Sequence, residues 1–94
     1  MLAAYHGHLP TVQLLLARGA DPDVLNERGQ SIIAGAVFKG EEEVVRCLYE
    51  EGKADLELGQ PSAREAAVMF RRVAALRLFG MEEEARGVEG SAPA

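Results

Sequence analysis

The chain of 94 residues has no tryptophan and a single cysteine, and aromatic residues make up only 5% of it. The lone Cys47 cannot form a disulfide within the chain, so the sequence favours a reducing, cytoplasmic location. With few large rings available, a core has to be built from alanine, leucine and valine. Such a core suits thin helical layers better than one large globular centre.

Long apolar runs and an excess of basic residues are also missing. No apolar stretch approaches the ~20 residues of a membrane span, and the N-terminus lacks the basic region and apolar core of a signal peptide. We therefore expect no membrane partner. The formal net charge of −5 argues against nucleic-acid binding, because that needs clustered cations to replace the counterions of the phosphates.

Residue patterns for catalysis, cofactors or metals are lacking too. His6 and His8 are two positions apart, so a helix would not place them on one face, and no third ligand follows at metal-site spacing. Glycines occur singly and not as a phosphate-binding loop. The acidic run 41–43 is better explained as a solvated helix start than as a cation site. The sequence therefore predicts no enzyme, no cofactor and no metal.

What the sequence does contain is an internal repeat. Ala36 follows Ala3 at the same spacing at which Gly40 follows Gly7. A fixed period of this length is typical of repeat arrays. Each copy has small apolar residues, a glycine, an apolar segment and a second glycine, which predicts helix, turn, helix and turn.

The copies resemble the ankyrin repeat. The first copy matches at Leu2-Ala3-Ala4-x-x-Gly7-His8-Leu9, Val12-x-x-Leu15-Leu16 and Gly19-Ala20-Asp21-x-Asp23. The second matches at Gly29-x-Ser31, Gly40, Val44-Val45, Leu48 and Gly52-x-Ala54-Asp55. It begins Ser31-Ile32-Ile33-Ala34 where the family has Thr-Pro-Leu-His, and one residue is inserted near Lys53. In a third, weaker copy Ala67 follows Ala36 by a step that is two positions shorter than the step from Ala3 to Ala36.

The resemblance implies an all-α, ankyrin-repeat-like solenoid of stacked antiparallel helix pairs joined by projecting finger loops. We expect a domain over residues 1–80, made of a partial repeat 1–25, a full repeat 26–59 and a degenerate terminal repeat 60–80. Residues 81–94 are expected to be a flexible tail, with room for one helical turn over 81–86, because the end is rich in Gly, Ser, Pro and Ala. The expected helices are 3–6, 9–18, 32–39, 42–51, 63–70 and 73–79.

Two positions carry specific expectations. Arg71 occupies the place of the turn glycines Gly7 and Gly40, and a left-handed non-glycine residue costs roughly 1–2 kcal/mol. Either that strain is accepted, or the last two helices are joined differently. Cys47 lies among apolar residues, so we expect a buried filler and not a nucleophile.

By resemblance, the function is that of a non-catalytic protein–protein interaction module, with a protein partner of unknown identity. Ankyrin-like arrays meet their targets with finger loops and a concave helix face. Carried onto matching positions, this implies the partner-binding residues Tyr5, His6, Leu25, Glu27, Arg28, Gln30, Phe38, Lys39, Met69 and Phe70. Aromatic residues, Met and Arg are also favoured at interface centres, although Phe38 and Phe70 could equally be core residues.

A second hypothesis is structural. The chain could be a terminal cap or fragment of a longer array that is completed by self-association, since each repeat packs only on its neighbours. An apolar side of the first layer, including Leu2 and Leu9 or Val12, would then be exposed. The arginines of the last copy are either a solvated face or a basic patch for an acidic partner; they are Arg64, Arg71, Arg72 and Arg77.

Overall fold

The computed structural model describes residues 2–90, and over this range it contains seven α-helices. They are α1 (Leu2–Tyr5), α2 (Leu9–Ala17), α3 (Ile32–Lys39), α4 (Glu42–Glu50), α5 (Ala63–Met69), α6 (Val73–Leu78) and α7 (Glu82–Gly90). The first six lie within one residue of the limits that the sequence predicts. Within residues 2–90, β pairing is limited to an isolated bridge between Leu25 and Ser31. The all-α fold is confirmed.

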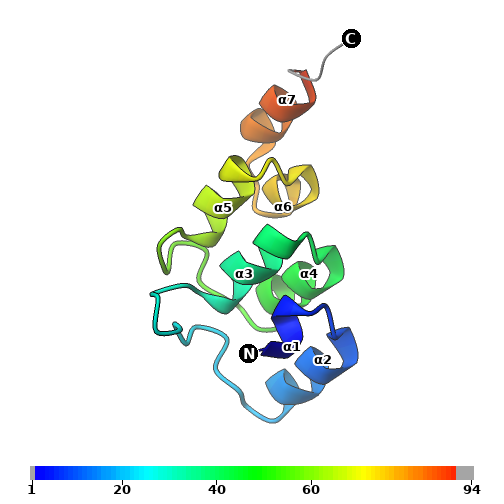
Figure 1. The fold of residues 1–94 in the computed structure, drawn as a ribbon. Coiled ribbons are helices and arrows are strands. Elements are labelled where there is room, and N and C mark those ends of the chain that lie inside the picture. The colour runs from blue at the N-terminus through cyan, green and yellow to red at the C-terminus, as the bar shows by residue number, and fades with distance from the viewer. Residues whose placement is uncertain (1, 91–94) are drawn as a thin grey trace.

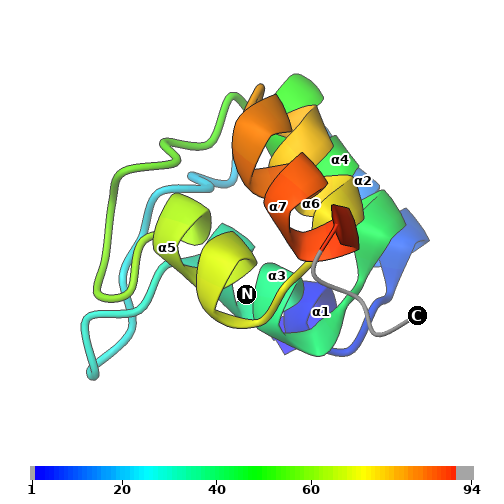
Figure 2. The same ribbon diagram turned by 90° about the horizontal axis from the view of Figure 1, so that it is seen from above.

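The helices form two layers (Figure 1). Helices α1, α3 and α5 lie side by side in one layer, which we call the inner layer, and α2, α4 and α6 form the outer layer. Seen from above, the loops after α2 and α4 project together from one side of the stack (Figure 2). We call residues 20–30 the first finger and residues 51–61 the second finger.

Local side-chain bonds define where helices begin. The Ser31 hydroxyl oxygen accepts a hydrogen bond from the backbone N–H of Ala34 at 3.2 Å, and this caps α3. Helix α5 begins with a reciprocal capping box, in which Ser62 and Glu65 each accept the other's backbone N–H. Pro10 occupies the first turn of α2, where its missing N–H has no cost.

One turn geometry closes all three helix hairpins. After α3, the N–H of Gly40 donates to the carbonyl of Val37 and the N–H of Glu41 to that of Ala36, each at 3.0 Å. The same pair of bonds recurs after α1 and α5. The central residue is left-handed each time, with φ of 73° at Gly40 and 53° at Arg71. Of the two alternatives for Arg71, the strained turn is therefore the one adopted.

The core lies between the two layers and is centred on the α3–α4 hairpin. Ile33, Val37, Val44 and Leu48 are among the largest fully buried side chains. Cys47 is buried beside them, which confirms the expected filler role. Toward the C-terminal end the inner layer contributes alanines instead; they are Ala63, Ala66 and Ala67.

The first layer is less open than the sequence suggests. Val12 is fully buried in the core and Leu9 is half-buried. The prediction that Val12 could lie on an exposed apolar side is wrong, because α2 turns that position toward α4. Leu14 is instead the exposed leucine of α2. The side chain of Leu2 lies outside the described part of the structure.

Helix α7 covers Glu82–Gly90, so the helical turn allowed over 81–86 is present, and the flexible tail expected after it is wrong over residues 87–90. Gly80, with φ of 76°, turns the chain directly from α6 into α7. Ala85 is completely buried, and Val88 packs against the core. Packing on α6 thus outweighs a composition poor in large apolar residues. Residues 91–94, the rest of that predicted tail, lie outside the described residues.

Aspartate side chains tie the two fingers together. The Asp23 carboxylate oxygen Oδ1 accepts a hydrogen bond from the backbone N–H of Asp55 at 2.8 Å. Within each finger the pattern continues, since Asp21 accepts from the N–H of Asp23 and Asp55 from the N–H of Glu57. The fingers are therefore held relative to each other by bonds from repeat to repeat.

Candidate functional site

Large apolar side chains are exposed at the same end of each inner helix. Tyr5 is the last residue of α1, Phe38 lies in the last turn of α3, and Met69 and Phe70 end α5. Their exposed fractions are 40%, 42%, 63% and 39%. We call these four side chains the aromatic row. Because the inner helices are neighbours in one layer, the row follows one edge of that layer.

Contacts between repeats hold the row in place. The rings of Phe38 and Phe70 lie 4.8 Å apart between centroids, with 38° between their planes. The Lys39 ammonium lies 5.2 Å from the centroid of the Tyr5 ring, a cation–π distance. His6 is exposed and contacts the Tyr5 ring edge-on. The row is therefore partly ordered before any partner arrives, and Phe38 and Phe70 are not closed core residues.

Arg72 supports the row from the backbone side. Its Nε donates to the carbonyl of Val37 at 3.1 Å and its Nη2 to the carbonyl of Phe38 at 2.6 Å. Both carbonyls belong to the last turn of α3, where carbonyls lack the usual helix partner four residues later; that of Val37 also accepts the N–H of Gly40. The sequence places Arg72 only in a basic group and does not predict this role. The sequence feature that indicates this role is a basic residue one repeat after the C-terminal end of a helix, where the last carbonyls need hydrogen-bond donors.

The predicted finger residues form a second, separate group. Leu25, Glu27, Arg28 and Gln30 are exposed at the tip of the first finger. Asn26 shapes this tip, because its Oδ1 accepts the backbone N–H groups of Arg28 at 2.9 Å and Gln30 at 3.0 Å.

The two groups stand at opposite ends of α3. The finger leads into the N-cap Ser31, whereas Phe38 lies near the other end of this eight-residue helix, about 10 Å away at 1.5 Å per residue. The structure thus brings Tyr5, Phe38, Lys39 and Phe70 together, and the finger residues among themselves. A partner touching both groups would have to follow the length of the inner layer.

Three arginines of the last repeat each interact with a different part of the structure. Arg64 pairs with Glu57 and also donates to the carbonyl of Phe79 at 3.2 Å. Arg77 pairs with Glu82 at 3.5 Å, which links α6 to α7. With Arg72 bound to α3, these side chains do not form one free basic patch.

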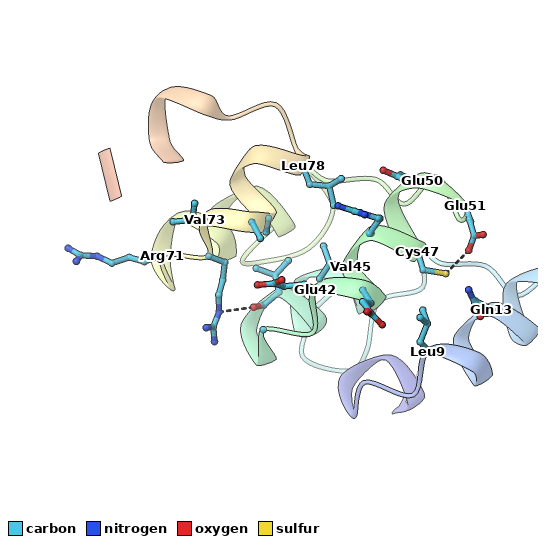
Figure 3. Close-up of a pocket in the computed structure, with 17 residues that line it drawn as sticks. Leu9, Gln13, Glu42, Val45, Cys47, Glu50, Glu51, Arg71, Val73 and Leu78 are labelled. Carbon is cyan, nitrogen blue, oxygen red and sulfur yellow. Dashed lines mark hydrogen bonds between the residues drawn. The ribbon is translucent and has the colours of Figure 1, made fainter. Parts of the chain in front are cut away.

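A hollow of about 750 Å³ lies along α4 and between α2 and α6 (Figure 3). Cys47 lines it, and its thiol donates to Glu51 Oε2 at 2.9 Å. Burial and the neighbouring carboxylate raise the pKa of Cys47 to about 12, so the thiol stays protonated at neutral pH. Such a thiol is a poor nucleophile.

Metal sites and membrane spans are two further classes of feature to consider for residues 2–90. No three His, Cys, Asp or Glu side chains gather closely enough there to hold a metal ion. Within the same range, none of the helices has both the length and the apolar character needed to cross a membrane.

Paired antiparallel helices that repeat in two layers, with loops projecting from one edge, define a helical repeat protein. The family model for ankyrin repeats matches residues 1–85 with three copies. The chain therefore belongs to the ankyrin repeat family. The residue limits of the separate repeats stay a prediction.

Two curated relatives share part of the sequence. The chain is 42% identical over 59 residues, 62% of its length, to mouse "Ankyrin repeat and SAM domain-containing protein 6". It is 40% identical over 52 residues, 55% of its length, to "Ankyrin repeat and KH domain-containing protein mask-1" of Caenorhabditis elegans. The matches span 7% and 2% of those proteins, so the likeness concerns their repeats and not their other domains.

Proposed function

We propose that the chain is a non-catalytic module that binds a protein partner through the aromatic row and the first finger. The observation that carries this proposal is the row itself, four large apolar side chains exposed in mutual register on neighbouring helices. Ankyrin repeats are in general protein–protein interaction modules, which supports the same reading. The lone protonated Cys47 fits a reducing, cytoplasmic setting.

The row has the properties of a binding hot spot. Aromatic residues and Met are enriched at interface centres, and a few such anchors carry most of the affinity. The ring contact of Phe38 with Phe70 and the Lys39–Tyr5 contact limit the side-chain freedom that binding would remove. At the finger, Arg28 adds an exposed cation on a loop that Asn26 holds in shape.

The test compares three alanine variants with the unmodified chain. A partner is first isolated by pull-down on the unmodified chain, and its affinity is then measured by calorimetry. We expect Phe38→Ala to weaken binding at least ~10-fold and Arg28→Ala by a smaller factor. Leu14→Ala is the matched control, because it removes an equally exposed apolar side chain from the outer layer. Circular dichroism checks that each variant folds.

Two outcomes would count against the proposal. Unchanged affinity in both Phe38→Ala and Arg28→Ala would place the partner elsewhere on the chain. A loss in Leu14→Ala equal to that in Phe38→Ala would show that any exposed apolar residue matters, and the row would have no special role.

A second candidate function rests on the length of the relatives, of which the matches span 7% and 2%. The chain would be part of a longer array, or would complete itself by self-association. Sedimentation equilibrium over a range of concentrations tests the second form. A dimer weakened by changes on α1 or α2 would support it, whereas a monomer at every concentration would favour the module.

A further inference from the structure

The hollow on the outer layer carries an inference that is independent of the proposed function. We propose that it binds a basic amphipathic segment of a protein, one with aliphatic side chains on one face and Lys or Arg on the other. This would be a second docking site, lined by none of the residues of the aromatic row.

The floor of the hollow is apolar. Leu9 of α2, Val45 of α4 and Val73 and Leu78 of α6 line it, so all three outer helices contribute (Figure 3). Leu9, Val73 and Leu78 are half-buried and thus keep surface that a ligand could cover. The volume of about 750 Å³ lies in the range of clefts that hold compact apolar groups. An amphipathic helix laid along such a groove is a common form of recognition.

The rim of the hollow is acidic. Glu42, Glu43 and Glu50 are exposed along α4, and none of them forms an ion pair within the described residues. Three arginines also line the hollow. Arg71 points away from the other lining residues (Figure 3) and Arg72 is bound to carbonyls of α3, so the exposed Arg46 is the cation left to offset these three carboxylates. Carboxylates therefore remain in excess along the rim, which favours a basic segment over acidic proteins and nucleic-acid phosphates.

Helix stability alone does not explain this rim. Glu42 and Glu43 stand in the first turn of α4, where an anion is favourable. Glu50 is the last residue of the same helix and Glu51 is its C-cap, and there an anion opposes the helix dipole. Glu51 at least bonds the Cys47 thiol. Arg46 stands four residues before Glu50 on α4 and offsets part of this cost. The remaining cost at the edge of the hollow fits a role of Glu50 toward a cationic ligand.

Three synthetic probes separate the contributions of charge and apolar contact. The first is a fluorescent helical peptide of about 18 residues with Leu on one face and Lys on the other. The second replaces each Lys with Glu, and the third replaces each Leu with Ser. In fluorescence anisotropy at low salt we expect the Lys–Leu peptide to bind at least ~10-fold more tightly than either of the others. Equal binding of the Lys–Leu and Glu–Leu peptides would overturn the proposal.

Matched charge variants locate the site. Glu43→Lys with Glu50→Lys changes the rim, whereas Glu83→Lys with Glu84→Lys makes the same change of net charge on α7, outside the hollow. We expect at least a ~10-fold loss for the Lys–Leu peptide in the first pair and less than ~2-fold in the second. Equal losses would mean attraction to total charge only, and would contradict the proposal.

Two further measurements keep this test apart from that of the aromatic row. Phe38→Ala should leave the affinity for the Lys–Leu peptide unchanged, since Phe38 is not in the hollow. In NMR spectra of the unmodified chain, the peptide should shift amides of α2, α4 and α6, including those of Leu9, Cys47 and Leu78. Shifts confined to α1, α3 and α5 would overturn the inference without affecting the proposed function.

Discussion

The central hairpin α3–α4 and the terminal hairpin α5–α6 share one turn geometry but are stabilised differently. The central hairpin supplies four of the six largest fully buried side chains, whereas the terminal hairpin supplies only Leu76. Helix α5 meets α3 with small alanine side chains. The central hairpin is therefore held mainly by apolar volume, whose removal leaves a cavity.

The terminal hairpin relies on polar bonds from side chain to backbone. Ser62 and Glu65 form the capping box, Arg64 reaches the carbonyl of Phe79, and Arg72 reaches two carbonyls of α3. Helix α7 then covers α6. The comparison shows that one repeat pattern can be stabilised by buried area or by single bonds, and the two differ in which changes they tolerate.

The largest effect is expected from Leu48→Ala in the central hairpin. The Leu48 side chain is fully buried, so truncation should lower the free energy of unfolding by about 2–5 kcal/mol. Leu14→Ala in the exposed part of α2 is the control and should cost no more than about 0.5 kcal/mol. Urea denaturation followed by circular dichroism measures both. Similar losses at the two positions would remove the distinction that the comparison draws.

A smaller loss is expected from Arg72→Ala in the terminal hairpin. It removes two charge-assisted bonds to α3 in a half-buried setting, and we expect a cost of about 1–2 kcal/mol. Arg72→Lys should recover only part of it, because one ammonium does not reproduce the planar fork. Arg71→Ala is the control, because it removes the neighbouring arginine side chain but keeps a Cβ on the left-handed residue. If Arg72→Lys restored the full free energy of unfolding, the charge alone and not the planar guanidinium would account for the effect of Arg72.

The shared turn gives a pair of changes with opposite sign. Gly40→Ala places a Cβ on a residue with φ of 73° and should destabilise by about 1 kcal/mol. Arg71→Gly relieves a residue with φ of 53° and should stabilise by up to about 1 kcal/mol, after the entropy that glycine adds to the unfolded chain. Thermal unfolding measures both. A loss of stability in Arg71→Gly would show that the arginine side chain contributes more than its backbone strain costs.

The smallest effect concerns the Cys47 thiol and pH. Its pKa is raised from 9.0 to about 12 in the folded chain, so the unfolded state loses the proton first as pH rises. The stability is therefore complete below pH 9 and declines as the pH approaches the folded value. At pH 9 we expect a loss of about 0.4 kcal/mol that Cys47→Ala lacks. Parallel pH profiles for the two proteins would contradict the raised pKa.

Sequence patterns defined the helices well because they act locally. The repeat period, the turn glycines and the Ser62-x-x-Glu65 box each determine a helix limit through neighbouring backbone bonds. All ten predicted partner-binding residues are exposed, although the sequence left open whether Phe38 and Phe70 belong to the core. Their role in binding stays a prediction.

Contacts between repeats could not be derived in the same way. The Phe38–Phe70 stack, the Arg72 bonds to α3 and the link from Asp55 to Asp23 join residues more than thirty positions apart. Only one turn of α7 was expected, because the residues after Arg86 have the composition of a tail and the packing of Val88 against the core cannot be seen in the sequence. Val12 was misplaced since its environment depends on α4 and not on its neighbours in the chain.

The bond from the Asp55 N–H to the Asp23 carboxylate has a consequence for how the stack comes apart. In a linear array each unit senses only its neighbours, and the ends can fray one unit at a time. A finger would ordinarily loosen before the helices it joins. Here the Asp23 carboxylate couples the opening of the first finger to that of the second. Local unfolding should therefore spread from finger to finger, which makes the projecting edge the cooperative part of the array.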